Sequence, residues 1–375
     1  MLCLVCAESL AEGKGVPPTV ELVALSNQHP KNVKIDGTCR PHPASAIETV
    51  RSLNVSDDGV RFCDLEKRCE RREHVELRCE DVLRITAPNA SPRQYGHRLQ
   101  ARNVGGELRL IATLHMESYV AGVVGAELGA APLAAQDAQA ILVRTFAMGA
   151  RRKHRHKDAP LCDLTHCQVY SGTITGAGWR AAKRTWGKFL VTPQGRPAPV
   201  FFHSTCGGET VSAHDAWPGG PPTNIVPVKD VDESGREYCA DSPYANWSLE
   251  VPTEQVGVVL SKLLQREVDH RSASIETLDD AGLQFRIGDR QGSKEIAGSR
   301  LIRAFGQELG WYKIKSSRFR VTSSPETFRF TGRGLGHRVG LCQFGAMKRA
   351  KAGASTEEIL RAYFPKLRLT AGAPK

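Results

Sequence analysis

The N-terminal part of the chain alternates β-branched and polar residues in short runs. Between residues 18 and 110, runs such as PTVELVAL and KNVKI are separated by Pro, Gly and Asn. A period of two places one face of a strand in a core and the other in water, and turn residues end each strand. The pattern therefore predicts a β-rich N-terminal domain over residues 18–110.

The pattern changes to helical spacing from about residue 111 to 153, where alanine is abundant. Gly129 is a typical helix end and Pro132 a typical helix start, so we expect two helices packed on each other. Strand-like runs return between residues 169 and 232, and residues 247–325 hold two amphipathic patterns, VGVVLSKLL and LIRAFGQELG. The last segment has a glycine-rich turn, GRGLGHRVG, and then a helix around EEILRAYF.

The order of these patterns predicts an α+β fold, in which a mixed α/β core follows the β-rich domain and carries a smaller inserted subdomain. The expected segments are a tail or export-signal remnant at 1–17, the β-rich domain at 18–110, the core at 111–246 and 326–375, and the inserted α/β subdomain at 247–325. No stretch approaches the ~18 to 20 consecutive apolar residues of a membrane-spanning helix, so we expect no membrane anchor in this chain. The apolar run at the start is too short for an intact secretory signal, which indicates either a signal that begins upstream or no signal.

The net charge of +11 favours an anionic partner, such as nucleic acid, a membrane surface or cell wall. The densest basic run, residues 151–157, has no interleaved aromatic residue, so base stacking is unsupported and a solvated helix end is expected. We therefore expect no nucleic-acid partner. The eleven cysteines are an odd number, which suits an oxidising compartment or a metal site, because at least one thiol must stay unpaired or bind something.

A glutamate falls inside an apolar helical stripe. In MESYVAGVVGAEL, a rotation of about 100° per residue puts the methionine and three valines on one side, with Glu127 in the middle of the same stripe. Burial disfavours a carboxylate, so the pKa of Glu127 is expected to rise into the range in which a carboxylic acid donates a proton near neutral pH. The alternative is that Glu127 reaches into water from the last helical turn, or pairs with a cation such as Arg144.

Four residues of zinc-ligand type lie within twelve positions, namely His156, Cys162, His166 and Cys167. Two thiolates and two imidazoles make the ligand set of a closed tetrahedral zinc site, which would staple the loop after the alanine-rich helix. The alternatives are that His154 replaces His156, or that Cys162 and Cys167 form a disulfide beside two surface histidines.

A series of motifs follows in order across residues 110–370. They are ESYVAGVVGAELG, APLAAQDAQAILVRTFAM, LCDLTHCQVYSG, VFFHSTCGGETVSAHDAW, YCADSPYANW, SSRFRVTSS and GRGLGHRVGLCQFGAMKRAKAGASTEEILRAYFP. Together they resemble the stage II sporulation protein D / amidase enhancer family. The resemblance implies an extracytoplasmic lytic transglycosylase that acts on the glycan strands of peptidoglycan, with its catalytic glutamate at Glu127 and a structural zinc on the four His and Cys residues.

In the chemistry that the resemblance implies, the lone carboxyl group protonates the leaving oxygen, the muramyl 6-hydroxyl attacks its own anomeric carbon, and anhydro-muramyl ends result. The family's second name implies a cell-wall amidase as a further partner. Two positions depart from the family: Arg338 replaces the second Gly of a Gly-His-Gly-Val-Gly turn, and Cys342 stands where Ser is common. The pairing of Cys206 with Cys239, or of either with Cys342, stays open.

The matched segments also contain polar and aromatic residues that suit sugar hydroxyls and N-acetyl groups. The expected substrate-contacting residues are Gln139, Arg144, Tyr170, Ser204, Thr205, His337 and Gln343. The alternatives are a solvated helix surface for Gln139, the core for Tyr170, and a turn for His337.

A second functional hypothesis is a non-catalytic wall-binding or amidase-activating protein, which the positive charge also suits. It predicts binding to sacculi that does not depend on Glu127. A nucleic-acid binder would rest on charge alone.

Overall fold

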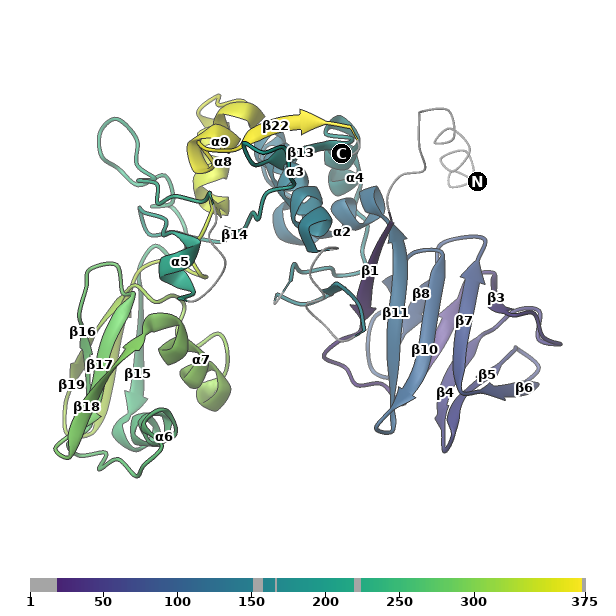
Figure 1. The fold of residues 1–375 in the computed structure, drawn as a ribbon, viewed down its shortest axis with the longest axis horizontal. Coiled ribbons are helices and arrows are strands. Elements are labelled where there is room, and N and C mark those ends of the chain that lie inside the picture. The colour runs from purple at the N-terminus through teal and green to yellow at the C-terminus, as the bar shows by residue number, and fades with distance from the viewer. Residues whose placement is uncertain (1–18, 151–157, 166, 219–223, 373–375) are drawn as a thin grey trace. The chain divides into compact units, whose positions relative to one another are not determined.

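The computed structural model describes residues 19–150, 158–165, 167–218 and 224–372 (Figure 1). Strands and helices are both abundant, and the strands dominate the N-terminal part, which confirms the α+β class predicted from the sequence. The chain forms two compact units. The first holds the described residues of Met1–Ala131, Gln139–Phe189 and Thr370–Pro374, and the second those of Pro132–Ala138 and Leu190–Leu369. The five segments expected from the sequence stay a prediction.

A six-stranded sheet runs through the first unit in the order β12-β1-β11-β10-β7-β3. Its strands are β1 (Thr19–Ala24), β3 (Cys39–His42), β7 (His74–Cys79), β10 (Arg98–Val104), β11 (Glu107–His115) and β12 (Leu161–Cys162). All neighbouring strands are antiparallel except β1 and β12, which are parallel. The long strand β11 lies between two others and is buried along most of its length, and it leads directly into a helix.

A second six-stranded sheet, in the order β6-β5-β4-β2-β8-β9, packs on the first, with β4 and β5 against β10. Its strands are β2 (Asn32–Asp36), β4 (Ser52–Ser56), β5 (Gly59–Cys63), β6 (Cys69–Arg72), β8 (Arg84–Thr86) and β9 (Arg93–Gln94). In β2 the side chains of Val33 and Ile35 are buried while their neighbours are exposed. This alternation is the period of two seen in the sequence, and it confirms the β-rich N-terminal region.

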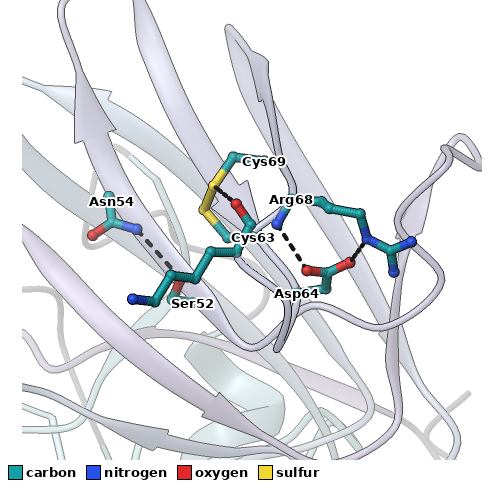
Figure 2. The surroundings of a disulfide bond; sticks show 7 residues. Ser52, Asn54, Cys63, Asp64, Arg68 and Cys69 are labelled. Carbon is teal, nitrogen blue, oxygen red and sulfur yellow. Dashed lines mark hydrogen bonds and ion pairs between the residues drawn. A yellow bond between two sulfur atoms is a disulfide. The ribbon is translucent and has the colours of Figure 1, made fainter.

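Two disulfides join strands that pair directly. Cys39 of β3 lies opposite Cys79 of β7, and Cys63 of β5 lies opposite Cys69 of β6. Figure 2 shows the second bond beside the turn, in which Arg68 donates to the carboxylate of the preceding aspartate at 2.6 Å. Disulfides of this kind form and persist in oxidising compartments.

Three helices complete the first unit, namely α2 (Met116–Leu128), α3 (Leu133–Ala150, from Gln139 onward in this unit) and α4 (Gly176–Arg184). Helix α2 ends beside Gly129, and α3 begins just after Pro132, as predicted. The prediction of helical structure from about residue 111 was wrong at its start, because residues 111–115 belong to β11 and the helix begins at Met116. The backbones of α2 and α4 approach each other closely, because a glycine without a side chain lies at their contact. A Cβ at Gly178 of α4 would overlap the carbonyl oxygen of Ala121 of α2. Gly122 of α2 in turn leaves room for the ring of Tyr170, which lies before α4.

A substructure of the second unit has its own hydrophobic core. Its antiparallel sheets have the orders β15-β20-β19 and β16-β17-β18. Its elements are β15 (Trp247–Pro252), α6 (Thr253–Leu264), β16 (Ser274–Thr277), β17 (Gln284–Asp289), β18 (Gly292–Ala297), α7 (Gly298–Leu309), β19 (Phe319–Ser323) and β20 (Thr327–Gly332). Phe285, Phe305, Phe319, Phe328 and Phe330 lie at the centre of this core.

The remaining elements of the second unit bring the terminal motif beside an earlier one. Strand β14 (Phe202–His203) runs parallel to β21 (Leu341–Cys342), which leads into α8 (Gln343–Lys351). Helices α5 (Ala213–Ala216) and α9 (Thr356–Tyr363) belong to the same unit. A two-stranded sheet joins β13 (Lys188–Val191) to β22 (Arg368–Ala371), and each of these strands has residues in both units. Among the described helices, none has the length and apolar character needed to cross a bilayer.

The glycine contact between α2 and α4 can be tested by adding one methyl group. Gly178→Ala should lower the free energy of unfolding by about 1–3 kcal/mol, because the new Cβ meets a backbone oxygen that cannot move aside. Gly149→Ala in α3 is the matched control. Its Cβ has open space around it, so better helix propensity should raise stability by about 0.5–1 kcal/mol. Urea denaturation of both variants measures the difference, and equal effects would refute the packing argument.

Candidate functional site

Glu127 lies in the last turn of α2. The apolar residues that share its predicted stripe, Met116, Val120, Val123 and Val124, are all buried, and Glu127 itself is half-buried. Its carboxylate accepts a hydrogen bond from the backbone N–H of Val169 at 3.4 Å. The side chain is therefore held partly inside the protein, at the edge of an apolar helix. That its pKa is raised stays a prediction.

Tyr119 connects the surroundings of Glu127 with those of the predicted zinc loop. Burial raises the pKa of Tyr119 well above its usual value, and the nearby charges of Cys167, Cys162 and, more weakly, Glu127 add to the shift. The Tyr119 hydroxyl donates to the side-chain oxygen of Gln168 at 3.1 Å. The carboxylate and the two cysteines thus belong to one neighbourhood of the first unit.

The predicted zinc ligands are described only in part. His156 and His166 lie outside the described residues. Cys162 is buried in β12, and half-buried Cys167 packs against the same small apolar cluster, after a turn closed by its N–H and the carbonyl of Leu164 at 2.9 Å. The two disulfides among the described residues do not include this pair. Two thiols at one short turn fit half of the predicted ligand set.

Arg144 pairs with Glu117 and not with Glu127, which corrects the alternative of a Glu127–Arg144 pair. Its Nε and Nη2 donate to the two oxygens of Glu117 at 2.8 and 2.5 Å, and its Nη1 donates to the carbonyl of Lys188 at 2.7 Å. The side chains of Arg144 and Glu117 are only 3% and 6% exposed. Through these hydrogen bonds the guanidinium of Arg144 joins α2, α3 and β13. A contact of Arg144 with substrate stays a prediction.

Gln139 and Tyr170 are both completely buried. Gln139 is therefore not the solvated surface residue of the alternative interpretation, and neither its amide nitrogen nor its oxygen has a hydrogen-bond partner among the described residues. Tyr170 stacks on Tyr119 with ring centroids 5.8 Å apart and donates to the carbonyl of Gln94 at 2.9 Å. These contacts make Tyr170 part of the core, and its role toward substrate remains untested.

The other four expected residues belong to the second unit and lie on adjoining segments there. Ser204 is half-buried beside Thr205, which is completely buried and shares a hydrogen bond of 2.7 Å with the hydroxyl of Ser242. Gln343 is buried as the first residue of α8, directly after β21. His337 stands in the turn before β21, where its Nδ1 accepts from the N–H of Val339 at 3.1 Å.

His337 belongs to an aromatic cluster that the sequence did not single out. Its ring lies 5.0 Å from that of Trp217, 5.6 Å from that of His203 and 6.1 Å from that of Phe201. Desolvation lowers the pKa of His337 to about 4, so its imidazole is neutral at neutral pH. Phe201, Trp217 and His337 are half-buried, and partly exposed aromatic rings next to polar groups suit a sugar.

The turn after His337 explains one departure from the family. Arg338 has a φ of 62°, the left-handed conformation in which glycine is favoured. Its side chain is nonetheless completely buried, and the guanidinium donates to the carbonyls of Ala281 and Glu209. Burial lowers the pKa of Arg338 to about 10. These hydrogen bonds offset the cost of the conformation, about 1–2 kcal/mol.

A cluster of metal-ligand type also lies in the second unit, and the sequence analysis did not predict it, although it considered disulfides among its three cysteines. Cys206, Asp230, Cys239 and Cys342 are all buried, with one ligand atom of each within 4.8 Å of the others. Among the described residues none of these three cysteines forms a disulfide, and the sulfurs of Cys206 and Cys239 are 3.6 Å apart. Asp230 was missed because nothing near it in the sequence resembles a ligand pair. The cluster could bind a metal.

Comparison with known proteins finds one family model and several related proteins that match this chain. Residues 104–191 match the family model described as Stage II sporulation protein. An uncharacterized protein of Brachyspira hyodysenteriae is 26% identical over 259 residues, which cover 68% of this chain and 66% of that protein. The amidase enhancer of Bacillus subtilis is 25% identical over 291 residues, or 66% of this chain and 40% of the enhancer. Stage II sporulation protein D of the same organism is 28% identical over 273 residues, or 68% of this chain and 74% of that protein.

The family-model match covers α2, α3, α4 and the segment of the predicted zinc ligands, and so includes Glu127. The matched part is 66% and 40% of the length of the first two relatives, so the chain spans less than two thirds of each. The chain therefore contains a Stage II sporulation protein domain over residues 104–191, and it is similar to the amidase enhancer and to stage II sporulation protein D.

Proposed function

We propose that this protein cleaves the glycan strands of peptidoglycan as a lytic transglycosylase, with Glu127 as its acid and base. The observation that carries the proposal is the half-buried carboxylate of Glu127, held by the N–H of Val169 at the end of an apolar helix within the family match. The family gives the protein a role related to the cell wall. The net charge of +11 suits an anionic polymer.

The proposed reaction needs one carboxyl group. Protonated Glu127 gives its proton to the glycosidic oxygen as the bond from that oxygen to the anomeric carbon of the muramyl residue breaks. The 6-hydroxyl of the same muramyl residue forms a new bond to the anomeric carbon, and its proton passes to the Glu127 carboxylate. The acid is thereby regenerated and the product carries an anhydro end. Water does not attack, so no second carboxylate is required, unlike in most glycoside hydrolases.

Other residues of the first unit keep the acid in place. The buried pair of Glu117 and Arg144 fixes the start of α2, while the contact with α4 fixes its side. In the second unit, neutral His337 and the ring of Trp217 offer polar and apolar surface to a sugar. We assign Ser204 and Gln343 to the same substrate-binding role.

A non-catalytic protein that binds the wall and activates an amidase is the second candidate function. The observation that favours it is the similarity to a protein named amidase enhancer. Under this hypothesis a cell-wall amidase is a partner and Glu127 has no catalytic role.

We also propose a structural zinc held by His156, Cys162, His166 and Cys167. Cys162 and Cys167 belong to one small apolar cluster and both lie near Tyr119, which supports a shared metal. Four protein ligands would leave no position for water, so the metal would order the loop beside α2 and take no part in the reaction.

We infer an extracytoplasmic location. The support is the pair of disulfides in the β-sandwich, because such bonds are rare in reducing compartments.

The catalytic proposal predicts the effect of Glu127→Gln. The amide keeps the size of the side chain but cannot transfer a proton, so the release of anhydro-muramyl products from purified sacculi should fall at least ~10² to 10⁴-fold. Binding to sacculi should persist, since the shape of the surface is unchanged. Mass spectrometry of the products and a pull-down by sacculi measure the two effects.

Two further variants control this experiment. Glu254→Gln replaces an exposed carboxylate of α6 and should leave product release unchanged. Glu117→Gln breaks the buried ion pair and should lower the free energy of unfolding by about 3–5 kcal/mol, so it shows what a purely structural loss looks like. Wild-type product release by Glu127→Gln would favour the amidase-activating function.

The zinc proposal predicts that wild-type protein contains one more equivalent of zinc than the Cys162→Ser/Cys167→Ser variant. Elemental analysis after gentle purification measures the difference. Equal zinc content in the two proteins, together with a disulfide between Cys162 and Cys167 in the wild type, would show that the loop holds no metal.

A further inference from the structure

Three thiols and one carboxylate from separate segments meet inside the second unit. Cys206 follows β14, Asp230 and Cys239 belong to the connection before β15, and Cys342 ends β21. All four residues are 0% exposed, and their ligand atoms lie within 4.8 Å of one another. Burying several groups that can carry negative charge is costly unless a positive charge compensates them.

The distances suit a shared metal ion better than a disulfide. The sulfurs of Cys206 and Cys239 are 3.6 Å apart, whereas a disulfide joins its sulfurs at about 2.0 Å. Two thiolates on one tetrahedral zinc, each about 2.3 Å from the ion, lie about 3.8 Å apart. The sulfur of Cys206 is 3.3 Å from Oδ2 of Asp230, close to the separation of about 3.6 Å expected for sulfur and oxygen ligands of one zinc.

Backbone N–H groups point at two of the sulfurs. The N–H groups of Cys206 and Gly345 donate to Sγ of Cys342 at 3.3 and 3.4 Å. Those of Gly207–Gly208 donate to Cys239, and both glycines have positive φ, 71° and 94°, which turns successive N–H groups to the same side. N–H donors stabilise thiolates, and they commonly surround sulfur ligands of metals.

The carboxylate of Asp230 is oriented by side chains behind it. The hydroxyl of Tyr363 donates to its two oxygens at 2.8 and 2.9 Å, and Nη2 of Arg349 donates to Oδ1 at 3.0 Å. A Cβ at Gly345 would overlap both Oδ2 and the Tyr363 hydroxyl, so the carboxylate occupies space that only glycine leaves. Ligating carboxylates are held in this way, and the charge of Arg349 offsets part of the cluster's negative charge.

We propose that these four side chains bind one zinc ion in a closed tetrahedral site. Thiolate ligands select zinc over magnesium and calcium, and four protein ligands leave no position for a reacting water. The ion would tie the turn after β14 to the first residue of α8, and so hold Ser204 and Gln343 on one framework. The site is separate from the zinc loop of the first unit, and it does not depend on glycan cleavage.

The test uses the full chain carrying Cys162→Ser/Cys167→Ser, so that metal on the other proposed site does not contribute. This protein, purified with zinc present, should contain one equivalent of zinc by elemental analysis. Adding Cys342→Ser should remove it, while the serine hydroxyl can still cap α8 by accepting from the N–H of Gly345. Substitution with cobalt should give a thiolate-to-cobalt charge-transfer band that is lost in the same variant.

A matched pair of aspartate variants tests the oxygen ligand. Asp230→Asn should lower the zinc content, and Asp241→Asn, which changes an exposed carboxylate on the same connection, should leave it unchanged. Equal zinc in the two variants would remove Asp230 from the site.

Counting reactive thiols in denaturant with a chelator distinguishes the metal site from a disulfide, and it does so even if a variant does not fold. Cys3→Ser and Cys6→Ser are added to the Cys162→Ser/Cys167→Ser protein, so that their thiols do not enter the count. The metal site then predicts three reactive thiols, from Cys206, Cys239 and Cys342. A disulfide between Cys206 and Cys239 predicts one. Absence of zinc together with the lower thiol count would overturn the proposal.

Discussion

The buried ion pair of Glu117 and Arg144 determines where helix α2 can lie. Both oxygens of the carboxylate are used by the guanidinium, and a third nitrogen of Arg144 reaches the backbone of β13, so the buried pair links three elements. Leaving either charge alone there would cost several kcal/mol, which makes other positions of α2 unfavourable. Glu127, three turns along the same helix, is half-buried because of this placement and the glycine contact with α4.

The cysteines of this chain follow two kinds of geometry. In the sandwich, cysteines stand directly opposite each other on paired strands and form disulfides. In the second unit, three sulfurs approach from different segments around a carboxylate, at distances too long for a disulfide bond. Cys342 stands where the family resemblance implies a serine, and its sulfur joins this group of thiols. This departure from the family has a physical reason in the proposed metal site, because the sulfur of Cys342 is the fourth ligand of the set.

The sequence predicted those features that depend on local chemistry. The period of two in NVKID produces a strand with buried Val33 and Ile35, since alternate side chains of a strand face opposite sides. Gly129 and Pro132 mark the gap between α2 and α3, because one residue type ends helices and the other begins them. The motif around Glu127 and the two cysteines of the loop likewise lie within the part of the chain that matches the family.

The tertiary structure alone decided which distant side chains meet. No local pattern indicates that Arg144 pairs with Glu117 rather than Glu127, because helical phase gives a direction but not the neighbouring helix that fills it. Tyr170 and Gln139 carry polar groups that suit a sugar, yet packing buries both completely. Asp230 joins Cys206 and Cys342 only when β14 and β21 pair, which brings together residues separated by more than a hundred positions. The sequence by itself determined the strands, the helices and the family motifs, since these depend on neighbours along the chain, while the partners of buried charges and thiols depend on long-range packing.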